Sequence, residues 1–99
     1  MSRQSDYIKT IALLCRDFLV AAGECPGLGP GTGRLAELVD GIVSSAEAER
    51  DAIVNLENAL AGLTRRTFSL YTRDPANTAL AALHERVNSL LRMCRELLD

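Results

Sequence analysis

Apolar residues recur at steps of three and four along almost the whole chain, and this spacing constrains the fold more than any other feature. Steps that average 3.5 residues place one apolar stripe along one side of an α-helix. The period-two alternation that indicates β-strands does not extend beyond a few residues. We therefore expect an all-α protein, an antiparallel helical bundle with shallow, coiled-coil-like helix crossings.

Three stretches carry the apolar spacing and predict three helices. The first covers about residues 5–22, with Ser5 as N-cap and Gly23 as its stop. A loop follows over 23–32, because residues 23–33 contain two prolines and five glycines. The last helix covers about residues 75–98, with Asp74 as N-cap and Pro75 in the first helical position.

The middle helix is predicted to cover residues 33–73, because the apolar rhythm keeps its phase from Leu35 to Leu70. Such a helix would be about 60 Å long at about 1.5 Å per residue. Ser44-x-x-Glu47 forms a capping box that could start a new helix, which would give four helices if the chain breaks near Ser44. We expect one long helix, since a loop has no reason to preserve the register.

Composition bounds the class of protein. Ninety-nine residues, 47% apolar and 24% charged, are typical of a single globular domain spanning 1–99. No apolar run approaches the length of about 18–20 residues that a membrane helix needs, and the N-terminus lacks the order of a signal peptide. Three cysteines at unrelated spacings predict free thiols in a reducing compartment, so we expect a cytoplasmic protein. A core of this size is modest, and we expect a homodimer.

Two helix surfaces are not explained by a single core. Leu13 and Val20 lie near Lys9 and Arg16, on the expected solvent face of the first helix, and are either incidental exposure, extra core or an interaction patch. The middle helix has a second stripe of small residues, which either a helix of the same chain, the reading we favour, or a symmetry mate or foreign helix would fill. The members of this stripe are Gly41, Ser45, Ala48, Ala52, Asn55, Ala59 and Gly62.

Charge is unevenly distributed along the sequence. Residues 37–57 contain six acidic residues and one arginine, whereas residues 65–95 contain six arginines and two acidic residues. The net charge is −2, which argues against a dedicated nucleic-acid-binding protein.

No motif indicates a reaction. The glycine-rich run 27–34 departs from a phosphate-binding loop, because Arg34 and Leu35 replace its lysine and hydroxyl residue and a helix precedes it. His84 has no serine or cysteine three or four residues away, Cys15 and Cys94 belong to apolar stripes, and Cys25 is the most accessible thiol. We expect no catalytic site, no metal site and no cofactor.

The sequence therefore favours a small non-catalytic module that occupies the surface of a partner protein, as an inhibitor, an immunity protein or antitoxin, or a phage-encoded modulator does. Ten arginines against one lysine are typical of a GC-rich bacterial or phage genome. The predicted partner contacts are Leu13, Val20, Glu47, Ala48, Asp51, Ala52 and Asn55.

Two other functions are open. The first is a helical export chaperone or adaptor, whose small-residue stripe would receive a helix of the client. The second is a nucleic-acid-associated regulator that uses the cluster of Arg65, Arg66 and Arg73.

Overall fold

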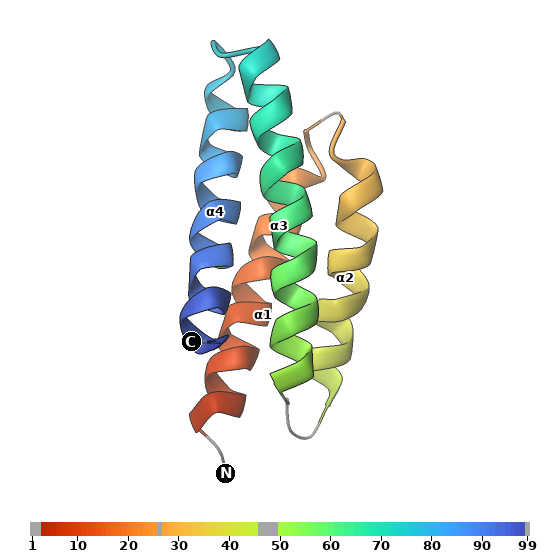
Figure 1. Ribbon diagram of the computed structural model, residues 1–99. Helices are drawn as coiled ribbons and strands as arrows, with labels where there is room; N and C mark the ends of the chain where they lie inside the picture. The colour runs from red at the N-terminus through yellow and green to blue at the C-terminus, as the bar shows by residue number, and fades with distance from the viewer. Residues whose placement is uncertain (1–2, 26, 46–49, 99) are drawn as a thin grey trace.

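The computed structural model describes residues 3–25, 27–45 and 50–98, and it shows four α-helices. These are α1 (Arg3–Ala22), α2 (Gly29–Ser44), α3 (Arg50–Arg73) and α4 (Thr78–Leu98). Consecutive helices run in alternate directions and pack side by side (Figure 1). No strand occurs in the described ranges. The all-α prediction is confirmed.

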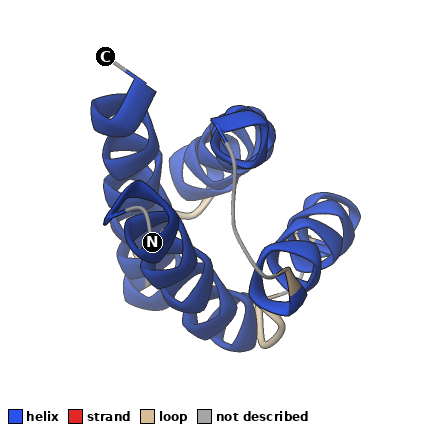
Figure 2. Cartoon of the chain, turned by 90° about the horizontal axis from the view of Figure 1, so that it is seen from below, coloured by secondary structure: helices blue, strands red, loops and turns tan. Residues whose placement is uncertain are grey.

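The helices form a four-membered ring of contacts. α1 packs against α2 and α4, and α3 packs against α2 and, most extensively, against α4. The view along the helices shows this arrangement (Figure 2). The bundle measures 45 × 25 × 17 Å. α1 and α3 are not among the closely packed pairs, so their outer sides belong to different faces of the molecule.

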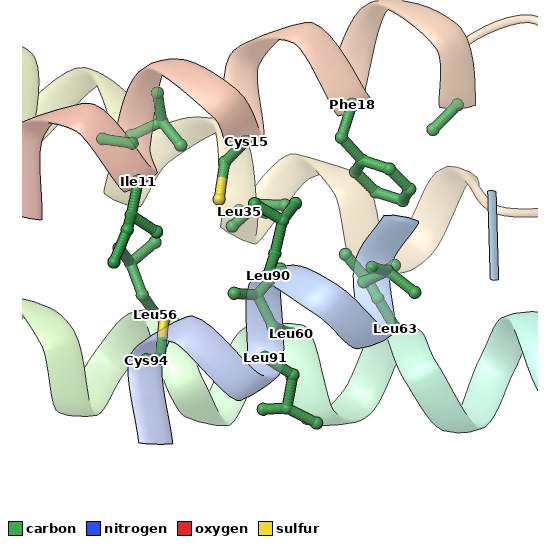
Figure 3. Close-up of a cluster of buried hydrophobic side chains, with 14 of the residues drawn as sticks. Ile11, Cys15, Phe18, Leu35, Leu56, Leu60, Leu63, Leu90, Leu91 and Cys94 are labelled. Carbon is green, nitrogen blue, oxygen red and sulfur yellow. The ribbon is translucent and has the colours of Figure 1, made fainter. Parts of the chain in front are cut away.

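The core consists of the apolar stripes that the sequence predicts. Phe18 of α1, Leu35 of α2, Leu60 of α3 and Val87 of α4 are all fully buried. Figure 3 shows side chains from the four helices meeting in this core. Thr67 is the exception in the stripe of α3, since it is polar and has no exposed surface.

The prediction of one continuous helix over 33–73 is wrong. α2 ends at Ser44, and Ser45 is extended, with φ −79° and ψ 147°. The Ser44 hydroxyl donates a hydrogen bond to the carbonyl of Asp40 at 2.7 Å, so Ser44 lies in the last turn of a helix and does not cap a new one. Two adjacent serines favour a helix end, because their side chains compete for backbone hydrogen bonds. The four-helix alternative is confirmed, and the compact bundle follows from it.

The preserved apolar register does not distinguish one long helix from two shorter ones, for a physical reason. Both arms of an antiparallel helical hairpin turn an apolar stripe toward the same core. The stripe therefore continues on the far side of the connection whether or not the helix does. An apolar register that is preserved across a loop shows that the two helices share a core. It does not show that they are one helix.

The loop between α1 and α2 is shorter than predicted, because α2 begins at Gly29 rather than at residue 33. A proline in the first turn is compatible with a helix, since the backbone amides there have no helical acceptor. Gly27 has a φ of +95°, and an added Cβ would lie 3.4 Å from Leu70. The Gly27 carbonyl accepts a hydrogen bond from Nε of Arg66 at 2.9 Å, and Leu28 beside it is fully buried. These contacts hold the loop against α3.

α4 begins at Thr78, three residues later than the start predicted at Pro75. Asn77 is the N-cap, because its Oδ1 accepts a hydrogen bond from the amide of Leu80 at 3.1 Å. The Asp74 carbonyl instead accepts a bond from the amide of Asn77 at 3.1 Å. Asp74 and Pro75 therefore belong to the turn that reverses the chain between α3 and α4.

Candidate functional site

Exposed apolar side chains are concentrated on α1. Six large hydrophobic residues are exposed among the described residues, and four of them lie on this helix. They are Tyr7, Leu13, Leu14 and Val20 on α1, and Val54 and Phe68 on α3. A contiguous apolar surface on one helix is a candidate for interaction with another protein.

Leu13 and Val20 lie on the exposed surface of α1, beside an arginine that reaches α2. Arg16 is three residues from Leu13 and four from Val20, so the three side chains are neighbours on the helix surface. Nη2 of Arg16 lies 3.6 Å from Oδ1 of Asp40 in α2, so the Arg16 side chain points toward α2. Val20 is 71% exposed and Leu13 is 49% exposed. We call these residues, with Arg16 and Asp40, the α1–α2 face.

Leu14 and Ala21 lie on the other side of α1, next to α4. Each lines a cavity of about 390 Å³ between α1 and α4. The two cavities share Ala82 and Arg86, so they adjoin each other and together make a hollow between α1 and α4. We call this hollow the α1–α4 groove. It exists because α4 presents small side chains there: Ala79, Ala82 and Ser89.

The structure divides the predicted partner-binding set. Glu47 and Ala48 lie outside the described residues. Asp51 and Asn55 are exposed and Ala52 is half-buried, all in the first turns of α3. Since α1 and α3 are not a closely packed pair, these residues do not form one surface with Leu13 and Val20. Partner binding stays a prediction both for Leu13 with Val20 and for the residues on α3.

The small-residue stripe is covered by this chain at some positions and open at others. A Cβ added at Gly41 or at Gly62 would meet nothing within 4 Å, so both positions face open space. Ala52 and Ala59 are half-buried and pack against the core. The favoured prediction of an intramolecular occupant is therefore wrong at Gly41 and Gly62.

The predicted arginine cluster does not form a single patch. All three arginines are exposed, and Arg66 alone among them donates a hydrogen bond within the described residues, to the Gly27 carbonyl. Arg66 and Arg73 are seven residues apart and share a side of α3, while Arg65 is turned from Arg66 by about 100°. The acidic and basic segments also meet, because Nε of Arg95 in α4 lies 3.2 Å from Oε1 of Glu57 in α3.

A polar and aromatic cluster joins α3 to α4, and the sequence analysis did not predict it. The Thr67 hydroxyl lies 2.8 Å from Nδ1 of His84. The His84 ring stacks on Tyr71, with centroids 6.5 Å apart and an interplanar angle of 6°, and its centroid is 5.7 Å from that of Phe68. The signal was Thr67 itself, a polar residue in an apolar stripe, which implies a buried partner. Because Thr67 has no exposed surface, its hydroxyl is not available to a substrate.

Two thiols are buried in the interior, Cys15 on α1 and Cys94 on α4 (Figure 3). Burial, and then the nearby Cys94, raises the pKa of Cys15 to about 12. Burial, and then the charge of Glu57, raises the pKa of Cys94 to about 11. Both therefore remain protonated at neutral pH and behave as small core residues, since the thiolate is the reactive form. Cys25, in the loop, is half-buried.

The described residues contain no group of three or more histidine, cysteine, aspartate or glutamate side chains placed to hold a metal ion. None of the helices within the described ranges has the length and hydropathy needed to cross a membrane. Comparison with known proteins finds no family model that matches the chain, and neither a curated protein nor a solved structure matches it.

Proposed function

We propose that this protein is a small non-catalytic module that acts by binding a partner protein through the α1–α2 face. The observation that carries the proposal is the exposure of Val20 and Leu13, at 71% and 49%, side by side on one helix. The class includes inhibitors, immunity proteins or antitoxins, and phage-encoded modulators. The arginine-rich composition supports a bacterial or phage source, and a cytoplasmic location stays a prediction of the sequence.

The α1–α2 face has the chemistry of a binding surface. Two aliphatic side chains, about 10 Å apart along the helix, are anchors that a partner can cover. Arg16 and Asp40 lie beside them, with side chains 49% and 77% exposed, and Glu37 of α2 is also exposed. Apolar anchors beside a solvated polar rim are the usual anatomy of an interface. An aliphatic partner surface with basic residues opposite Glu37 and Asp40 would fit it.

The export chaperone remains the second candidate because of the open space at Gly41 and Gly62. A helix of a client could approach the backbone closely at these positions. The nucleic-acid hypothesis has less support, since Arg66 is bound to the Gly27 carbonyl. A homodimer is part of both leading proposals.

The test of the proposed function is the double substitution Leu13→Asp with Val20→Asp. We expect the far-UV circular dichroism spectrum and the unfolding midpoint to remain close to those of the wild type, because both side chains are exposed. Capture of partner proteins from an extract of the source cells, quantified by mass spectrometry, should be lost. The matched control is Val54→Asp, which places a charge at an exposed apolar position of α3 and should leave capture unchanged.

Equal capture by the wild type and the folded double variant would exclude the α1–α2 face. Loss of capture in the Val54→Asp control would show that the effect is not specific to this face.

A further inference from the structure

The α1–α4 groove carries two charged side chains of opposite sign on its two walls. Asp17 lies on α1 between Leu14 and Ala21, which line the groove, and it is exposed. Arg86 lies on α4 and lines both cavities. Neither side chain forms an ion pair or a hydrogen bond with any described residue. Glu24 and Glu85 also line the cavities, and neither is within ion-pair distance of Arg86.

Asp17 and Arg86 lie at the same height along the bundle. Leu14 is about one turn before Asp17, and Ala21 is about one turn after it. Both of these residues line a cavity that Arg86 also lines. Arg86 therefore stands beside the segment of α1 whose midpoint is Asp17.

The walls between these charges are largely apolar. Tyr7, 54% exposed, is seven residues from Leu14 and shares its side of α1. On α4, the groove is lined by Ala82 and by Met93, with Leu90 beneath. The face also carries the exposed carboxylates of Glu24 and Glu85, so its self-complementary part is the apolar centre together with Asp17 and Arg86.

We infer that a second copy of this chain covers the α1–α4 groove, with α1 of each copy lying over α4 of the other and Asp17 of each copy facing Arg86 of the other. The inference rests on the homodimer in the proposed function but not on the foreign partner. The two binding events use different surfaces, because Leu14 lines the groove whereas Leu13 and Val20 do not. Asp17 borders both surfaces, since it is four residues after Leu13 and three before Val20.

Two kinds of two-fold symmetry can bring these faces together, with the axis parallel to the helices or across them. The charges of Asp17 and Arg86 favour the parallel axis. A two-fold axis parallel to the helices preserves height, so it brings Asp17 opposite Arg86 twice in each dimer. A two-fold axis across the helices brings α1 onto α1 and α4 onto α4. With this axis at the height of the two residues, Asp17 would face Asp17 and Arg86 would face Arg86, and both contacts are repulsive.

The area of the α1–α4 face indicates how large an interface the dimer could bury. α1 has 20 residues and α4 has 21. A face about 30 Å long and about 20 Å wide gives about 600 Å² for each copy and about 1,200 Å² in total. This is the lower end of the range for specific interfaces, so we expect a weak dimer.

The test uses charge reversal and sedimentation equilibrium at protein concentrations from about 1 μM to about 1 mM, a range that brackets such a dimer. Asp17→Arg alone and Arg86→Asp alone each replace two attractive contacts with two repulsive ones. Each should weaken the dimer at least tenfold, by an order-of-magnitude estimate for exposed charge pairs. An equimolar mixture of the two variants should restore the dimer, because every contact in the mixed dimer is again between opposite charges.

Two matched controls carry the same reversals at exposed positions on other helices, Glu37→Arg in α2 and Arg65→Asp in α3. They should dimerise as the wild type does. A wild-type chain that stays monomeric over the whole range overturns the inference. So does a wild-type dimer that both charge reversals leave intact, because the dimer would then use another face.

The failure of this inference is distinguishable from failure of the proposed function. The Leu13→Asp with Val20→Asp variant should still dimerise, and the Arg86→Asp variant, which changes α4 and not α1, should still capture the partner. Loss of the dimer in the Leu13 and Val20 double variant would contradict the separation of the two surfaces.

Discussion

α4 packs against α3 on one side and α1 on the other, and the two sides are built differently. Toward α3 it presents His84 and Arg95, which find partners in Thr67 and Glu57. Toward α1 it presents alanines and a serine, which leave two cavities, and Arg86, which has no ion pair among the described residues. α4 thus makes a closed interface with α3 and an open interface with α1, although one continuous apolar stripe runs along it.

The difference shows which positions determine how completely the interface between two helices excludes solvent. The apolar stripe is buried on both sides and is common to both interfaces. The residues that flank it decide the rest, because their size and polarity either fill the space between the helices or leave it to solvent. We therefore expect substitutions at the α3–α4 interface to reduce stability, and substitutions at the α1–α4 groove to reduce association.

The largest contrast should come from shortening one leucine at each interface. Leu60→Ala in α3 removes a fully buried side chain and should lower the free energy of unfolding by about 2–5 kcal/mol. Leu14→Ala at the groove, where the side chain is 38% exposed, should cost less than about 1 kcal/mol. Chemical denaturation at concentrations low enough to keep the chain monomeric measures both. Similar costs for the two would refute the contrast between the interfaces.

Alkaline pH tests how completely the core excludes water from the two buried thiols. The two buried thiols have pKa values of about 12 for Cys15 and about 11 for Cys94, against 9.0 for an ordinary thiol. Between pH 9 and these values the unfolded chain loses thiol protons that the folded chain keeps. Stability is therefore full below pH 9 and falls as the pH rises toward 11 to 12. The loss should be about 1 kcal/mol for each thiol at about pH 10.

The measurement is the free energy of unfolding by denaturant as a function of pH. The variant Cys15→Ala with Cys94→Ala should lose this slope, although it starts from a lower stability. Ile53→Val, a truncation elsewhere in the core, should be less stable and keep the slope. A flat profile for the wild type would mean that water solvates the two thiols in the folded chain.

The smallest effect should come from the hydrogen bond of the closed interface. Thr67→Val keeps the shape of the side chain and leaves Nδ1 of His84 without its partner, which should cost about 1 kcal/mol. In a His84→Leu chain the same substitution should cost less, since it then removes only the bonds of the Thr67 hydroxyl to the Leu63 and Thr64 carbonyls. This double-mutant cycle isolates the bond to His84. Equal costs in the two backgrounds would show that the bond to His84 contributes no stability.

Several features of the candidate surfaces could be read from the sequence. Val20 and Leu13 are exposed where the helical spacing places them outside the stripe. The assembly of these residues with Asp51 and Asn55 was not predictable. It depended on whether α2 and α3 are one helix, and the spacing is the same in either case.

Local residue chemistry was ambiguous at the helix ends. Asp74 followed by a proline is a strong helix start, and Asn77 is an equally good N-cap three residues later. The turn between α3 and α4 must reverse the chain and align two long apolar stripes. The register of these stripes, rather than cap strength, selects Asn77.

The sequence by itself determined the helical class, the buried stripe on each helix and the apolar excess on α1, because helical periodicity is a property of neighbouring residues. Only the tertiary structure decided the break at Ser44, the pairing of Thr67 with His84 and the separation of Leu13 from Leu14 onto two faces. These depend on which helices become neighbours. That choice is made by packing between residues far apart in the chain, about which local spacing carries no information.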